Sequence, residues 1–166
     1  MFRPKADPVA PGQESVWQFP RPAIAEQTPS LLRIEWDGRV LAETTRGVRT
    51  LETSHPPSYY FPPEDIDLAM LAVADGPRSI CEWKGQARYF DVVSGARRAV
   101  RAGWSYPSPT APFEKMRDYV AFYAAAMDAC FVDGERVTPQ PGGFYGGWIT
   151  TRFAGPFKGG PGSQFW

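Results

Sequence analysis

The sequence predicts a mainly β fold, and three observations support this prediction. The chain of 166 residues contains 16 glycines and 18 prolines, a content that favours short strands and tight turns over long helices. Hydrophobic residues make up 43% of the chain and aromatic residues 14%, which is enough for the core of one domain. Apolar and polar residues also alternate with a period of two in several stretches that end at turn dipeptides.

Residues 1–30 are rich in proline and predict an extended arm. Proline fixes φ and has no amide donor, so a central strand is not expected here. Trp17 and Phe19 are the residues that we expect to anchor the arm on the rest of the chain.

A β domain is expected over residues 31–138. Its first element is a hairpin over Leu32–Glu43, in which apolar and charged residues alternate on both sides of the turn dipeptide Asp37-Gly38. Val48–Glu52 predicts a third strand. Ser54–Pro63 contains four prolines around three aromatic residues and predicts an ordered loop.

Glu64–Val73 predicts a short helix. Prolines precede it, its first two residues are acidic, which suits the positive end of a helix, and its apolar residues recur on one face. Ala87–Val93 and Ala99–Trp104 then predict two strands joined by the turn Ser94-Gly95.

The last part of the domain mixes helical and extended signals. Phe113–Asp118 predicts a turn of helix, and Tyr119–Tyr123 and Ala129–Val132 predict strands. The three alanines Ala124–Ala126 also allow a helix between these strands. Asp133-Gly134 repeats the hairpin chemistry of the first turn.

Residues 139–166 contain eight glycines and seven aromatic residues, a composition that suits neither a regular strand nor a helix. A disordered tail would rarely contain so many large apolar side chains. We therefore expect a C-terminal strap that docks on its own domain or on a second copy of the chain, which would be a homodimer.

The charge balance argues against several classes of function. Lys and Arg together number 18, as do Asp and Glu, so neither a nucleic-acid surface nor a basic membrane anchor is expected. The longest apolar run, Tyr119–Met127, is nine residues long and too short to span a bilayer. Two cysteines and no apparent signal segment lead us to expect a reduced, cytoplasmic protein.

The segment Cys81–Gly85 is the strongest candidate for a site. It places a thiol, a carboxylate, an indole and an amine within five residues and ends on glycine, immediately before a predicted strand. An ammonium group near a thiol lowers the thiol pKa and makes it a better nucleophile. Because residues three apart face opposite sides of a regular strand, Cys81 and Lys84 can meet only if the chain bends at Gly85.

Four motifs occur together in this chain, namely Tyr60-x-Pro62 followed by Asp65, Cys81-x-x-Lys84-Gly85-x-Ala87-x-Tyr89, Trp104-x-Tyr106-x-x-Pro109 and Val120-Ala121-Phe122-Tyr123. Through this combination the sequence resembles the DUF427 family of unknown function over about residues 31–138. The flanking segments, above all the C-terminal glycine and aromatic extension, resemble those of a longer branch of that family.

The resemblance implies an antiparallel two-sheet β-tent of the Mss4-like kind, with one or two short helices and a concavity between the sheets. Many proteins with that fold hold zinc through two Cys-x-x-Cys pairs. This chain contains no such pair, and His55 with Cys81 and Cys130 would lack a fourth ligand, so we expect no metal and no cofactor.

Aromatic residues close to this segment are the candidate walls of a ligand cleft between the sheets. Aromatic walls with a few polar groups suit a flat heterocycle or a cation, although the same rings would also serve as the core of a small β domain. Glu52, Glu82 and Asp65 are the acidic candidates, and Glu52 and Lys84 are the candidate polar contacts. Glu82 is expected in an ion pair and His55 in a solvent-facing turn. The candidate ligand-binding residues are Glu52, Tyr60, Trp83, Gly85, Tyr89, Trp104 and Tyr106.

Three functions therefore remain open. The leading hypothesis is a domain that binds a small polar or heterocyclic molecule. The second is an enzyme that uses Cys81, assisted by Lys84, as a nucleophile or redox thiol. The third is a structural or interaction module that assembles through the strap at residues 139–166.

Overall fold

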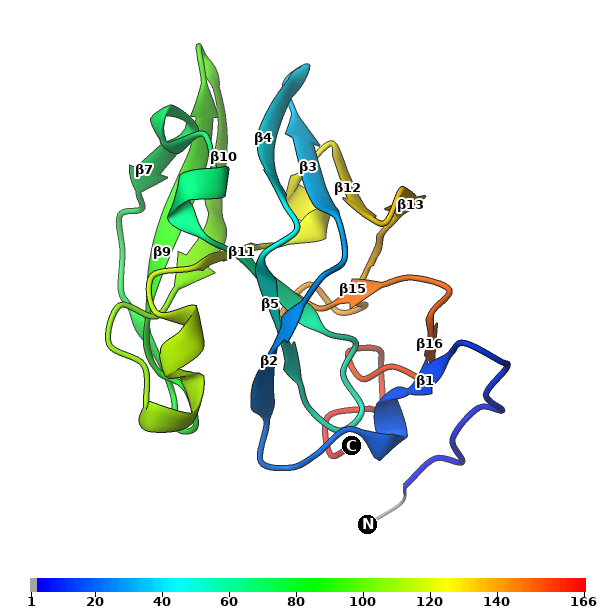
Figure 1. The fold of residues 1–166 in the computed structure, drawn as a ribbon. Helices are drawn as coiled ribbons and strands as arrows, with labels where there is room; N and C mark the ends of the chain where they lie inside the picture. Colours follow the sequence, from blue (N-terminus) through cyan, green and yellow to red (C-terminus); the bar gives the residue numbers. More distant parts are fainter. Residues whose placement is uncertain (1–2) are drawn as a thin grey trace.

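The fold consists of β-sheets joined by turns and short 3-10 helices, as seen in a computed structural model that describes residues 3–166 (Figure 1). The sheets are antiparallel apart from one two-stranded parallel pair in the flanks. The expected mainly β class is confirmed. The largest sheet has the strand order β2-β5-β6-β11-β10-β9-β7, and β8 pairs with β9 beside this path. Its strands are β2 (Ile24–Thr28), β5 (Gly47–Leu51), β6 (Ser58–Phe61), β7 (Leu71–Val73), β8 (Ser79–Cys81), β9 (Gly85–Ser94), β10 (Arg97–Ser105) and β11 (Val120–Phe122).

A second sheet has four strands in the order β13-β12-β3-β4. Its strands are β3 (Leu32–Trp36), β4 (Arg39–Thr44), β12 (Ala129–Val132) and β13 (Glu135–Arg136). Two further pairs join short strands of the flanks, and these strands are β1 (Glu14–Ser15), β14 (Thr138–Pro139), β15 (Trp148–Ile149) and β16 (Phe153–Ala154). The 3-10 helices are η1 (Val16–Gln18), η2 (Pro63–Asp65), η3 (Leu68–Met70), η4 (Ala111–Met116) and η5 (Ala124–Ala126).

Both hairpins of the four-stranded sheet follow from their turn dipeptides. Asp37 and Gly38 have φ of 53° and 69°, and Asp133 and Gly134 have φ of 48° and 81°. Two successive positive φ values match the twist of the flanking strands, and Asp-Gly reaches them at low cost. The predicted hairpin over Leu32–Glu43 and the second turn are therefore confirmed.

The prediction of a loop over Ser54–Pro63 is wrong, because this segment contains the central strand β6. The strand pairs with β5 on one side and β11 on the other. Prolines flank the strand and do not interrupt it, so each residue between them keeps its amide donor.

The predicted helix over Glu64–Val73 is also wrong, since the segment forms η2, η3 and β7. Ile66 is extended, with φ of −116°, and forms an isolated bridge to Ala42 of β4. Asp67 donates its amide to the Leu41 carbonyl at 2.8 Å and accepts the Ala69 amide, which starts a new turn. Pairing with the neighbouring sheet therefore outweighs the helical periodicity.

Alternating residues of the large sheet supply two separate cores. Tyr59, Phe61 and Phe122 face the four-stranded sheet and pack with its apolar side chains, among them Trp36. Tyr60, between Tyr59 and Phe61, joins a second core on the opposite face, which is covered by the loop and helix around η4. The large sheet is thus buried on both faces, and the candidate site belongs to the second face.

The two flanks pack against each other and against this domain. In the N-terminal flank, Val16, Trp17 and Phe19 form a third core with Leu51 and Phe153. The expected anchors Trp17 and Phe19 are each 7% exposed. Residues 24–28, which the sequence assigned to the arm, form the edge strand β2.

The strap docks on its own chain through Trp148. This side chain is fully buried in the core between the sheets, and its Nε1 donates to the Phe122 carbonyl at 3.0 Å. The strap is also held by two short strand pairs: β15, which contains Trp148, pairs with β14, and β16 pairs with β1 of the N-terminal flank.

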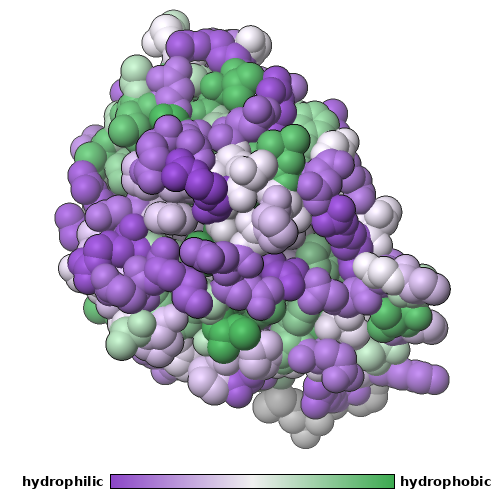
Figure 2. Space-filling view, viewed as in Figure 1, coloured by the Kyte–Doolittle hydropathy of each residue, from purple (hydrophilic) through white to green (hydrophobic). Residues whose placement is uncertain are grey.

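The molecular surface is mostly polar on the face drawn in Figure 2, where hydrophilic residues form a band and hydrophobic residues appear in separate patches. Within residues 3–166, none of the helices has the length and apolar character needed to cross a membrane.

Candidate functional site

A cleft of about 530 Å³ lies on the second face of the large sheet. Strands β5, β6, β8, β9 and β10 form its floor and one side, and the strap forms the other side. The predicted position between the two sheets is wrong, because the first core fills that space. The cleft is lined by Thr50, Glu52, His55, Ser58, Tyr60, Ser79, Ile80, Cys81, Lys84, Tyr89, Trp104, Tyr106, Tyr123, Gln140, Gly143, Phe144, Tyr145, Gly146 and Lys158.

The floor is a row of residues in register across four strands. Tyr60 of β6 pairs with Ala121, Ala121 with Trp104, and Trp104 with Tyr89, so their side chains share one face. Trp104 Nε1 donates to the Tyr60 hydroxyl at 3.2 Å. The Tyr123 ring lies 4.6 Å from the Trp104 ring, centroid to centroid. Four of the predicted aromatic residues therefore do line one cleft, namely Tyr60, Tyr89, Trp104 and Tyr106.

Burial keeps the phenols of the floor neutral. It raises the pKa of Tyr60 and of Tyr106 far above the usual value for tyrosine, and that of Tyr123 to a smaller extent. Neutral hydroxyls can both donate and accept hydrogen bonds. The aromatic floor thus offers polar contacts without adding negative charge.

The turn Glu82–Lys84 brings the thiol and the amine together. Cys81 and Gly85 pair across the end of the β8–β9 hairpin, and Lys84 Nζ lies 3.9 Å from Cys81 Sγ. The bend that the sequence required at Gly85 is present, with φ of 114°. The ammonium group also lies 5.9 Å from the centroid of the Phe113 ring. A thiol beside a cation in an open cleft can act as a nucleophile.

The loop before η4 fixes the position of this turn. The Thr110 amide donates to the Lys84 carbonyl at 3.0 Å, and the Thr110 hydroxyl donates to the Trp83 carbonyl. A Cβ on Gly85 would lie 3.1 Å from the Ser108 carbonyl oxygen, so glycine allows this close approach. Trp83 and Gly85, both predicted to bind a ligand, support the turn and do not line the cleft.

Glu52, His55 and Gln140 form a chain of contacts in the wall of the cleft. Glu52 Oε2 lies 3.3 Å from His55 Nε2, and Gln140 Nε2 lies 3.0 Å from His55 Nδ1. Gln140 Oε1 accepts the Gly147 amide at 3.0 Å, which leaves Nε2 to donate to His55. His55 Nδ1 is then the acceptor, and Nε2 carries the proton toward Glu52.

These contacts set the charge of Glu52. Burial favours the neutral acid, but the hydrogen bond with His55 and the nearby Lys84 ammonium outweigh it and lower the pKa of Glu52. The expectation that His55 faces solvent is wrong, since its side chain is 12% exposed and packs against the Tyr145 ring at 4.7 Å.

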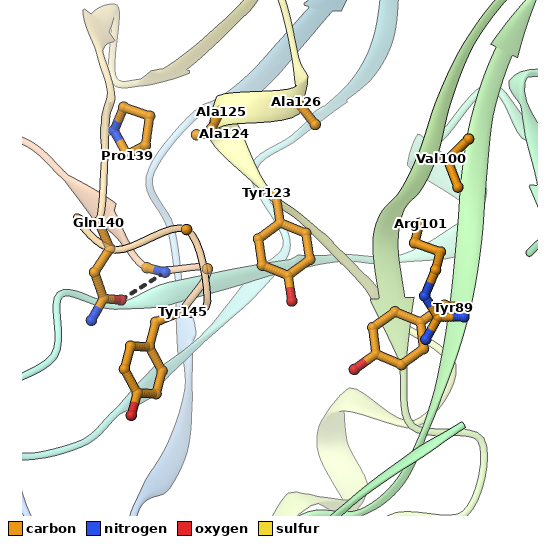
Figure 3. A pocket seen from close by; sticks show the side chains of 13 residues that line it. Tyr89, Val100, Arg101, Tyr123, Ala124, Ala125, Ala126, Pro139, Gln140 and Tyr145 are labelled. Atoms are coloured by element: carbon orange, nitrogen blue, oxygen red, sulfur yellow. Dashed lines mark hydrogen bonds between the residues drawn. The ribbon is translucent and has the colours of Figure 1, made fainter. Parts of the chain in front are cut away.

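The cleft opens into an adjoining pocket of about 500 Å³, shown in Figure 3. Tyr89, Tyr123, Gln140 and Tyr145 line both spaces. On one side the Arg101 guanidinium stacks 4.1 Å from the centroid of the Tyr89 ring, and the three alanines of η5 form another side. The two spaces together form a trough that runs from Lys84 to η5.

Several lining residues were missed by reasoning from sequence. His55 precedes two prolines and lies three residues from Glu52, but only the fold turns it inward. Gln140, Tyr145 and Lys158 come from the strap, whose docking position has no local signal. Of the acidic alternatives, Glu82 is exposed, and Asp65 bonds Thr44 and Arg46 outside the cleft.

The described residues 3–166 contain no group of three or more His, Cys, Asp or Glu side chains that could hold a metal ion. Both cysteines are free, Cys81 half-buried in the cleft and Cys130 buried in the first core.

No curated protein matches the chain. The family model described as domain of unknown function DUF427 matches residues 24–133, which is more than half of the chain and includes every strand of both large sheets except β13. The chain belongs to the DUF427 family.

Proposed function

We propose that this protein binds a small, planar, polar molecule in the cleft between the sheet and the strap. The observation that carries the proposal is the convergence of rings from three separate strands, from the segments that follow β10 and β11, and from the strap on one open space, with charged groups at one end. Ligand sites in proteins commonly have this form, a concave and largely apolar wall with a few oriented polar groups.

The rings of the floor would stack on the flat faces of the ligand. Tyr60, Trp104 and Tyr106 are rigidly packed, so ordering them costs little on binding. Lys84 and Glu52 would make the polar contacts from the charged end. A volume of about 530 Å³ suits a base, a nucleoside or a small heterocycle.

A thermal-shift panel of nucleosides, bases and small aromatic amides tests this proposal, followed by calorimetry on each compound that stabilises the protein. Tyr89→Ala removes one wall of the trough, and we expect it to weaken binding about tenfold, the effect of one lost stacking contact. Tyr119→Ala is the matched control, because Tyr119 is half-buried on the same face of the sheet outside the trough. Failure of the whole panel, or equal binding by both variants, would contradict the proposal.

The Cys81–Lys84 contact supports a second candidate, an enzyme that uses Cys81 as its nucleophile. The thiolate would add to an electrophilic carbon of the bound molecule, and the thiol proton would leave to solvent. A pH profile of alkylation tests this candidate, with Cys130 as an internal control because burial raises its pKa to about 12. Cys81 should react faster than free cysteine at neutral pH and slow in Lys84→Met; a rate equal to that of free cysteine excludes the mechanism.

A further inference from the structure

We infer that the ligand of the cleft carries an anionic group, a carboxylate or a phosphate, which Lys84 binds. This inference rests on the proposed function and specifies its ligand class. It follows from the charges that line the trough and from the partners that those charges already have.

Positive charge predominates along the trough. Lys84 and Lys158 line the cleft, and Arg101 lines the adjoining pocket. Among the described residues that line either space, Glu52 is the only carboxylate. The tyrosines do not change this balance, because burial keeps them neutral. The walls therefore attract anions.

Most of these charged groups already have partners. Glu52 is held by His55, and Arg101 donates to the carbonyls of Asp75 and Pro77. Lys158 Nζ donates to the Trp166 carbonyl oxygen at 3.2 Å. Of the cations that line the trough, one is left without a strong acceptor and can donate to a ligand.

Lys84 is that cation. Within the described chain its ammonium group forms no ion pair, and its hydrogen-bond partner is the Cys81 sulfur at 3.9 Å, a weak acceptor. The group is half-buried beside the Phe113 ring, where water solvates it less completely than at the surface. A carboxylate or phosphate oxygen would supply the strong, charge-assisted hydrogen bond that the protein does not supply.

The position of Lys84 also limits the shape of the ligand. Its ammonium lies beside Cys81, and Cys81 packs against the cluster that contains Tyr60 and Tyr106, so the amine is close to the aromatic floor. An anionic group bound to Lys84 would therefore be attached to a planar ring through a short linkage. Aromatic carboxylates and nucleoside monophosphates share this chemistry.

Matched pairs of ligands test the inference. In the first pair, nicotinate carries a carboxylate and nicotinamide a neutral amide. In the second pair, adenosine monophosphate carries a phosphate that adenosine lacks. We expect at least one anionic member to bind the wild-type protein about tenfold more tightly than its neutral partner, and the difference to shrink as salt is added. The two pairs show which anion the cleft takes.

Lys84→Met keeps the length of the side chain and removes its charge. It should abolish the preference for the anion, so that the anionic and neutral partners bind the variant about equally. Lys115→Met is the control, since Lys115 is an exposed lysine of η4 that lines neither space, and it should keep the preference.

The outcomes separate this inference from the proposed function. Equal binding of neutral and anionic partners, or a preference that survives Lys84→Met, overturns the inference while the proposed function stands. Absence of binding by all four compounds and by the wider panel overturns both.

Discussion

At the scale of single residues, the cleft owes its charge state to burial and not to unusual residue types. Tyrosines on the floor lose solvent and stay protonated, whereas Glu52 keeps its charge because His55 and Lys84 compensate for the same loss. The buried tyrosines therefore stay neutral and Glu52 stays ionised across neutral pH.

Acid stability depends in part on one carboxylate that does not line the trough. The Arg97 guanidinium and the Asp37 amide hold the pKa of Asp128 at about 2, below its ordinary value of 3.8. Its ionised form thus stabilises the folded state fully above about pH 4, and this contribution is lost as pH falls through about 2. We predict that Asp128→Asn destabilises the protein at pH 6 and flattens the loss of stability between pH 4 and 2.

Urea unfolding at a series of pH values measures this effect. Asp75→Asn is the control, because Asp75 is exposed and forms no ion pair in the described chain. An Asp128→Asn curve that runs parallel to the wild-type curve down to pH 2 would contradict the assignment.

At the scale of elements, the β8–β9 turn is the part of the site that depends most on backbone geometry. Gly85 combines a φ of 114° with the close approach of Ser108, and two hydrogen bonds from Thr110 tie the turn to the loop before η4. The thiol and the amine meet only while this turn keeps its shape.

We predict that Gly85→Ala destabilises the protein by at least about 1–2 kcal/mol, since a side chain there is strained by the positive φ alone. Gly160→Ala is the matched control, because a Cβ at Gly160 has no atom within 4 Å and its φ is not positive. Denaturant unfolding compares the two variants. If both lose equal stability, the turn is not constrained as described.

Local chemistry accounts for the elements that the sequence predicted correctly. Asp-Gly turns and alternating residues gave the hairpin Leu32–Glu43, and Ser94-Gly95 gave the β9–β10 pair. The errors occur where distant partners decide: β6 needs both β5 and β11, and Ile66 is extended because Ala42 pairs with it.

The site was predictable to a similar extent. Cys81 and Lys84 could be chosen because they lie together beside one glycine, and Tyr60, Tyr89, Trp104 and Tyr106 because they belong to the motifs of the family resemblance. Tyr123 belongs to such a motif as well but was not among the predicted ligand-binding residues. The strap residues could not be chosen, because no local pattern in 139–166 determines where a segment docks. His55 was assigned to solvent for the same reason, since its partner Gln140 lies 85 positions away.

At the scale of the whole molecule, the strap acts as a structural part of the domain. Trp148 occupies the centre of the first core, and Gln140 with Lys158 completes the cleft. The homodimer expected through the strap remains a proposal, which light scattering of the full chain tests. Because Trp148 is part of the first core, we expect removal of the strap to lower the folding stability of the domain whether or not the chain forms a dimer.

We predict that Trp148→Ala costs about 3–5 kcal/mol of folding stability, the usual effect of emptying a buried tryptophan site. Phe165→Ala, in the same segment but 67% exposed, should change stability little. Truncation after Thr138 should abolish cooperative unfolding. A truncated chain that unfolds cooperatively at the wild-type midpoint would show that the strap is dispensable.

The strap also limits what can be inferred about the ligand of this protein from its family. The matched segment ends at residue 133, whereas the strap side of the trough begins at Pro139. A homologue with the same matched segment and a different tail would keep the tyrosine and tryptophan floor but lose the opposing wall. Selectivity in such proteins would then evolve through the tails, and a ligand identified for one member would not transfer to another without comparing those tails first.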